Sequence, residues 1–143
     1  MEISLFDGSE SPSKRFLSTV SPTTHTLFLA HYDGNTGHGG LDADFAVGSE
    51  QFEWYDRLTR RTDRRFVVTL YNEQNASMRN KEGRRWHQMF ARGTACITGF
   101  GYFAERAVFE GHPYFNTSVS GRGDRYPDPH SQFLASVDNY ILL

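Results

Sequence analysis

Apolar and polar residues alternate along much of this chain, in short runs separated by Gly, Pro, Asn and Asp. The longest strand-like run is 86–111. Within it the rings of Phe100 and Tyr102 fall on one face, and Gly99 and Gly101 fall on the other, because successive side chains of a strand point to opposite faces. The run therefore predicts a strand that bends or bulges at the two glycines.

Similar short patterns predict a mostly β fold for the rest of the chain. Further strands are expected at 16–20, 24–32, 65–71, 107–109, 114–119 and 132–143. Turns are expected at Arg92–Gly93, which would pair 86–91 with the strand after Gly93, and at Glu105–Arg106, and a long polar loop at 72–83. Many short strands with frequent turns predict an antiparallel β-sandwich or small barrel, in a single domain spanning residues 1–143.

One helix is expected near 49–61. Ser49 can cap its start, Glu50 and Glu53 lie in its first turns, and Arg60 and Arg61 lie at its end. Acids near the start and bases near the end complement the helix dipole.

Composition supports a globular domain. Of 143 residues, 38% are apolar and 15% aromatic, which excludes a wholly disordered chain. The one cysteine, Cys96, lies in an apolar setting and is expected to be a buried structural thiol. The N-terminal residues do not resemble a signal peptide, and no apolar run is long enough to span a membrane. We expect a soluble protein, in the cytoplasm or in a particle.

Charge is segregated along the chain. Residues 1–56 carry nine acids and two bases, whereas residues 57–92 carry ten bases and three acids. Arginine interleaved with aromatic rings suits nucleic-acid or phosphate binding. The candidate binding residues are Arg57, Arg60, Arg61, Arg64, Arg65 and Trp86. The alternative is a solvated helix end whose arginines pair with neighbouring acids.

A Gly-rich loop at 33–44 offers metal-ligand chemistry. His31, Asp33, His38 and Asp42 bring imidazole and carboxylate together, a combination that suits zinc or manganese. The loop is not a calcium-binding EF-hand, because His38 stands where glycine is needed and flanking helices are missing. The alternative is a solvated turn without a metal.

Catalytic signatures are weak. The chain has no nucleophile elbow, phosphate loop or dinucleotide-binding pattern. A Cys96–His87 dyad on adjacent strands is conceivable but would need an exposed thiol. Arg122-Gly123-Asp124 resembles an adhesion triplet, for which an ordinary turn is the alternative. We therefore predict no catalytic residues.

The final residues are apolar, and termini are more often polar. Tyr140, Ile141, Leu142 and Leu143 are therefore expected to be buried, in the core or against a second copy. Together with the segregated charge, this predicts a non-enzymatic structural or binding domain that self-associates or joins a larger assembly, such as a virion or other particle. The alternatives are a metal-dependent hydrolase using the 31–44 loop and a nucleic-acid or phosphate binder using segment 57–92; no further cofactor is identified.

Overall fold

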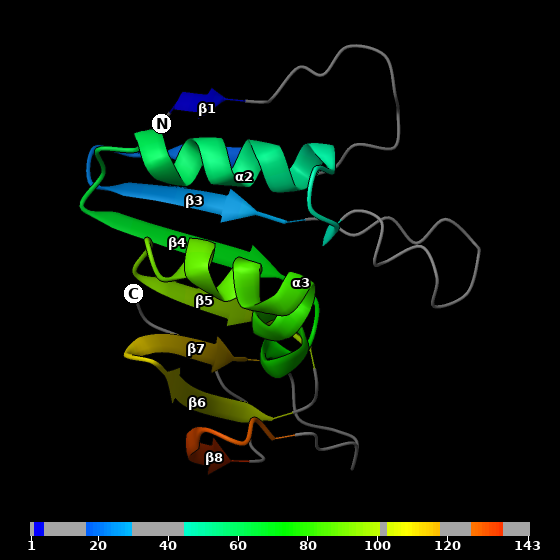
Figure 1. The fold of residues 1–143 in the computed structure, drawn as a ribbon. Coiled ribbons are helices and arrows are strands. Elements are labelled where there is room, and N and C mark those ends of the chain that lie inside the picture. The colour runs from blue at the N-terminus through cyan, green and yellow to red at the C-terminus, as the bar shows by residue number, and fades with distance from the viewer. Residues whose placement is uncertain (1, 5–16, 30–44, 101–102, 118–126, 136–143) are drawn as a thin grey trace.

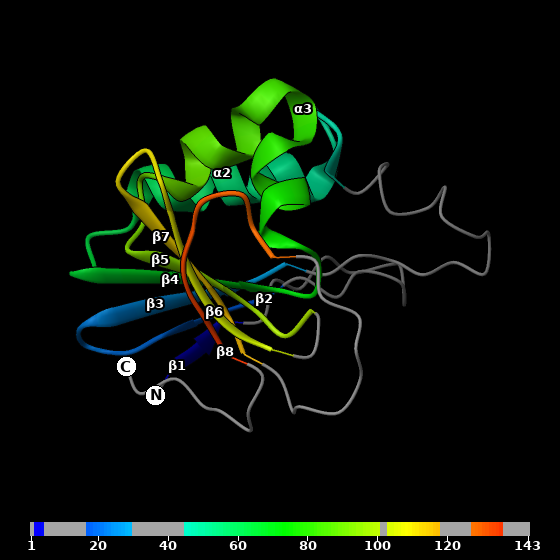
Figure 2. The same cartoon turned by 90° about the horizontal axis from the view of Figure 1, so that it is seen from below.

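The computed structural model describes residues 2–4, 17–29, 45–100, 103–117 and 127–135. Within these ranges, strands form one mixed sheet and helices pack on one of its faces (Figures 1 and 2). The strands are β1 (Glu2–Ser4), β2 (Leu17–Val20), β3 (Thr24–Phe28), β4 (Phe66–Tyr71), β5 (Ala95–Thr98), β6 (Ala104–Phe109), β7 (His112–Asn116) and β8 (Ser131–Ala135). The helices are α2 (Glu50–Arg61) and α3 (Asn75–Phe90).

The strand order across the sheet is β1-β2-β3-β4-β5-β7-β6-β8. The four central strands β3, β4, β5 and β7 are parallel, and the outer strands pair antiparallel. The chain crosses from β3 to β4 through α2, and from β4 to β5 through α3. Both crossovers step in the same direction across the sheet, so right-handed connections place both helices on the same face.

The strand-rich character of the chain is confirmed, but the antiparallel prediction is wrong for the centre of the sheet. Val67 and Val68 are both buried, as are Cys96 and Ile97 on the next strand. Strands buried on both faces are typical of parallel sheets, although the described helices cover only one face here. The described strands also form one open sheet with β1 and β8 at its edges, rather than the predicted sandwich or closed barrel.

Helix α2 confirms the predicted helix near 49–61. The Ser49 hydroxyl accepts a hydrogen bond from the Phe52 backbone N–H at 3.2 Å and so caps the helix. Tyr55 is fully buried against the sheet, and its hydroxyl lies 2.6 Å from the Thr69 hydroxyl. Sequence and structure agree here because the cap, the charges and the apolar face all specify the same element.

Helix α3 corrects two predictions, the loop at 72–83 and the strand at 86–91. Trp86, Met89 and Phe90 are buried at helical spacing. The strand prediction was wrong because it relied on the aromatic residues of this run, which are common in strands. The helix is interrupted at 81–84, where the backbone leaves helical conformation and Gly83 has φ 61°. All residues between Met78 and Trp86 are polar or glycine, so the sequence shows no continuous apolar pattern through the segment.

The run 86–111 is therefore helix, strand and hairpin rather than one long strand. β5 ends at Thr98, so exposed Gly99 lies beyond the strand, while Gly101 lies outside the described residues. The turn expected at Glu105–Arg106 lies instead at Glu110–Gly111, with φ values of 47° and 81°. Two central residues with positive φ are typical of the tight turns that join two-strand hairpins, here β6 and β7.

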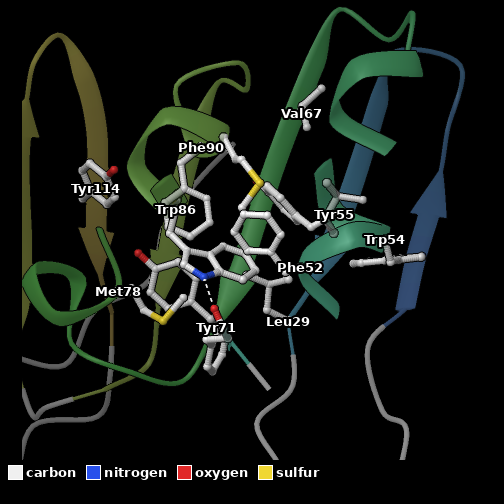
Figure 3. Close-up of a cluster of buried hydrophobic side chains, with 14 of the residues drawn as sticks. Leu29, Phe52, Trp54, Tyr55, Val67, Tyr71, Met78, Trp86, Phe90 and Tyr114 are labelled. Atoms are coloured by element: carbon white, nitrogen blue, oxygen red, sulfur yellow. Dashed lines mark hydrogen bonds between the residues drawn. The ribbon is translucent and has the colours of Figure 1, made fainter. Parts of the chain in front are cut away.

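The core fills the space between the helices and the sheet. Trp86 lies at its centre, and the rings of Phe52, Tyr55 and Phe90 pack against it at centroid distances of 5.5–5.6 Å (Figure 3). The Trp86 indole N–H donates to the Phe45 carbonyl at 2.7 Å. This aromatic cluster ties α2, α3 and the sheet together. None of the described helices has the length and apolar character needed to span a membrane.

Candidate functional site

The carboxyl ends of the four parallel strands meet at one edge of the sheet, where the arrowheads of β3, β4 and β5 lie together in Figure 1. Helix α3 begins at the same edge, directly after β4. In open α/β sheets, ligands bind outside the carboxyl ends of the strands. This edge is therefore the first place to look for a site.

A small pocket lies there, which we call the carboxyl-edge pocket. The residues that line it come from the start of α3, the β5–β6 connection, the strands β6 and β7 and the approach to β8. They are Gln74, Asn75, Ala76, Phe100, Phe103, Glu105, Asn116 and Asp128. The cavity has a volume of about 20 Å³, which is room for one water molecule.

Two buried amides in the pocket each have one atom without a hydrogen-bond partner among the described residues. The Tyr71 hydroxyl donates to Asn75 Oδ1 at 2.8 Å, which fixes that amide and leaves Asn75 Nδ2 without a hydrogen bond among the described residues. Asn116 Oδ1 likewise has no partner among them. Both residues are 4% exposed. A buried polar atom without a partner costs about 1–3 kcal/mol, so a polar group that enters the pocket is stabilised.

The pocket also carries buried charge. Glu105 Oε1 accepts from the Asp128 backbone N–H at 2.7 Å. Burial raises the pKa of Glu105, and this hydrogen bond opposes the rise. The Asp128 carboxylate forms a two-pronged ion pair with the guanidinium of Arg79, whose Nε is also buried without a partner among the described residues. Two carboxyl groups beside one guanidinium disfavour an anionic ligand.

A hydrogen-bonded chain of side chains leads from the core to this pocket. Cys96 Sγ lies 3.5 Å from His112 Nε2 and is also hydrogen-bonded to Tyr71, which in turn holds Asn75. Cys96 is fully buried, as predicted, and burial raises the pKa of its thiol well above the ordinary value. A protonated, inaccessible thiol is no nucleophile.

His87 lies apart from Cys96 in the hydrogen-bond network. It belongs to α3, not to a neighbouring strand, so the conceivable Cys96–His87 dyad is wrong. Its Nδ1 lies 2.6 Å from the Tyr114 hydroxyl, and its Nε2 lies 3.2 Å from a Glu110 carboxylate oxygen. Burial lowers the pKa of His87, against the effect of Glu110. The imidazole thus links α3 to the β6–β7 turn.

The predicted basic residues do not gather at the carboxyl edge. Arg57, Arg60 and Arg61 lie exposed on the C-terminal half of α2, and Arg64 and Arg65 follow in its connection to β4. Trp86 is 0% exposed and cannot stack on a base. Arg60 lines a groove between α2 and α3, whereas Arg61 and Arg64 line a second groove beside His25.

The other predicted site residues lie outside the described residues. These are His31, Asp33, His38, Asp42, the Arg122–Asp124 triplet and Tyr140–Leu143. Their metal, adhesion and interface roles stay predictions. Within the described part of the chain, no group of three His, Cys, Asp or Glu side chains is placed to hold a metal.

Sequence reasoning missed the pocket residues because it assigned Asn75 and Arg79 to a loop. A polar residue at the end of a strand was the available signal, since Asn116 is the last residue of β7. Asp128 gave no local signal, because its partner Arg79 lies 49 residues away. Comparison with known proteins finds no matching family model and no matching curated protein.

Proposed function

We propose that the protein is a non-enzymatic binding domain whose carboxyl-edge pocket takes the end of a neutral polar group that both accepts and donates a hydrogen bond, such as a primary carboxamide. The observation that carries the proposal is the pair of buried, unpartnered atoms Asn75 Nδ2 and Asn116 Oδ1. A carboxamide oxygen accepts from the first, and a carboxamide N–H donates to the second.

The charge and the volume of the pocket restrict the range of possible ligands further. A carboxylate ligand would meet Glu105 and Asp128, so a neutral group is favoured. The cavity of about 20 Å³ admits only the end of a larger molecule. Phe100 is 37% exposed and gives the rest of such a molecule an apolar ring to pack against.

The test is a titration followed by NMR of the side-chain amide groups. Acetamide, acetate and ethanol are added separately to the ¹⁵N-labelled full chain. Acetamide should shift the NH₂ signals of Asn75 and Asn116 in a saturable way, with a Kd of about 1–100 mM because so small a ligand makes few contacts. Acetate should shift them less than acetamide does.

Two Asn→Leu variants, one inside the pocket and one on the surface, test whether acetamide binds in the pocket. Asn116→Leu removes the free acceptor at similar volume and should abolish the acetamide shift at Asn75. Asn72→Leu makes the same change at an exposed position just after β4 and should leave the shift intact. The proposal fails if acetamide leaves both amide signals unmoved, or if the two variants weaken binding equally.

Self-association is a second candidate, favoured by the edge strand β8. Among the described strands, β8 pairs on one side only, with β6. Its Phe133 is 57% exposed and its Leu134 is 44% exposed. An edge strand with exposed apolar side chains is a template for pairing with another chain. Light scattering of Phe133→Lys beside the unchanged protein tests it: a dimer or polymer lost in the variant supports the candidate, and a monomer in both removes it.

A further inference from the structure

A groove between α2 and α3 is lined by several positively charged side chains. Its volume is about 350 Å³, and its lining comes from both helices and from Arg92 just after α3. We call it the arginine groove. Its lining residues are Phe52, Asp56, Arg60, Arg85, Gln88, Met89 and Arg92.

Asp56 holds the two walls of the arginine groove together. Its carboxylate accepts from Arg60 Nε at 2.8 Å and from Arg92 Nη1 at 2.6 Å. The hydrogen bond from Arg60, and secondarily that from Arg92, lowers the pKa of Asp56, so the carboxylate stays ionised. The two guanidinium groups are thereby fixed in position, while the Arg60 side chain remains 61% exposed.

The groove has more positive than negative charge. Three guanidinium groups face one carboxylate in its lining. Arg85 is exposed and has no carboxylate partner among the described residues. Arg57 is also exposed on α2, whereas Arg61 lines the second groove beside His25. Guanidinium forks match the geometry of phosphate oxygens, and their remaining N–H groups are free for an anion.

We propose that the arginine groove binds the phosphate backbone of nucleic acid, independently of the carboxyl-edge pocket. An extended polyanion fits better than a single phosphate ion. The groove lies toward the C-terminal half of α2, where the helix dipole disfavours one isolated anion, whereas successive phosphates of one chain can contact Arg60, Arg85 and Arg92 on both walls of the groove.

The structure also indicates how the nucleic acid is recognised. Trp54 and Trp86 are buried, and Phe52 is 8% exposed in the floor of the groove, so no ring in the lining is presented for stacking on a base. Binding is therefore expected to be independent of base sequence and at least as strong for a duplex as for a single strand.

The test is fluorescence anisotropy of a labelled 20-base-pair DNA duplex and of its single strand, from 50 to 200 mM NaCl. Binding of the unchanged protein should weaken steeply as salt rises. Arg85→Gln should weaken it several-fold and lower the slope of log K against log salt by about one. Arg106→Gln is the matched control, because Arg106 is exposed on β6, away from the groove, and pairs with Gln132.

Three results would overturn the proposal. One is the absence of duplex binding at 50 mM NaCl, and another is an equal loss of binding in Arg85→Gln and Arg106→Gln. The third is displacement of the duplex by inorganic phosphate beyond the effect of chloride at matched ionic strength, which would assign the groove to a small anion. Circular dichroism of each variant confirms that the fold is kept, since neither arginine is buried.

Discussion

Arg79 and Asp128 lie 49 residues apart and form an ion pair that is almost sealed from solvent, with side chains 2% and 1% exposed. The pair joins the first half of α3 to the segment that leads into β8. Asp128 also lines the carboxyl-edge pocket. We expect the Arg79–Asp128 pair to contribute more to stability than the exposed ion pairs among the described residues.

Asp128→Asn should lower the free energy of unfolding by about 3–5 kcal/mol, because it leaves a buried guanidinium without its counter-charge. Arg84→Met is the matched control. Both arginines lie over the Phe109 ring, at 4.7 and 4.8 Å, but Arg84 is exposed and pairs with exposed Glu110, so its loss should cost about 0–1 kcal/mol. Urea unfolding measures both, and equal effects would contradict a special role for the buried pair.

Stability should fall as the pH is lowered through the range 6.5 to 4. Burial, and secondarily His87, lowers the pKa of His112 from 6.5 to about 4 in the folded state. The unfolded chain then binds a proton that the folded chain does not, so the contribution of about 3 kcal/mol is present above pH 6.5 and is lost by about pH 4.

His112→Gln should flatten this pH dependence without abolishing it. Burial lowers the pKa values of His25 and His87 as well, and they act in the same direction. Glu105 acts in the opposite direction because its pKa is raised, so the comparison is best repeated in a Glu105→Gln background. Urea unfolding at pH 7 and at pH 4.5 gives the difference, and an unchanged slope in His112→Gln would contradict the assignment.

Gly83→Ala should cost about 1 kcal/mol, because φ at this position is 61° and an added Cβ would meet no neighbour within 4 Å. The cost is then conformational rather than steric. Gly99→Ala is the matched control: its Cβ would lie 3.6 Å from the Thr117 carbonyl, an ordinary contact, and its effect should be near zero. A thermal-unfolding midpoint lowered equally in both would contradict a conformational origin.

Tryptophan fluorescence should not change when a duplex binds the arginine groove, because Trp54 and Trp86 are 2% and 0% exposed. Emission should be blue-shifted and poorly quenched by iodide. Trp86→Phe should cost about 2–4 kcal/mol through the cavity and the lost bond to the Phe45 carbonyl, and should affect stability rather than nucleic-acid affinity. Quenching of emission by the duplex would show instead that a tryptophan contacts it.

The parts of the fold predicted from the sequence are those that local chemistry specifies. Helix α2 has its cap, charges and apolar face within one segment, and β4 has its run of Val and Leu. Helix α3 was not predicted because the residues between Met78 and Trp86 are all polar or glycine, so no apolar helical pattern crosses the segment. The prediction of an antiparallel sheet was wrong for the same reason, because β4 and β5 are parallel only if a crossover such as α3 connects them.

The candidate site was less predictable than the fold, because its members come from distant segments. Asn75, Glu105, Asn116 and Asp128 are ordinary polar residues in the sequence, and only strand order brings them together. The pairing of the α2 arginines with neighbouring acids was predicted and is seen for Arg60 and Asp56, but the second bond of Asp56, to Arg92, could not be predicted from the sequence. The aromatic residue chosen as a stacking platform, Trp86, was instead the centre of the core.

The hairpin of β6 and β7 also bears on how fast the chain reaches this structure. Its two strands are joined by two residues and can pair early, whereas β5 and β7 pair in parallel only after the chain has looped back past β6. Once the hairpin has formed, β7 offers an unpaired edge to which β5 can add in parallel. Substitutions at Gly111 should slow refolding, while those in the β5–β7 contact should chiefly accelerate unfolding.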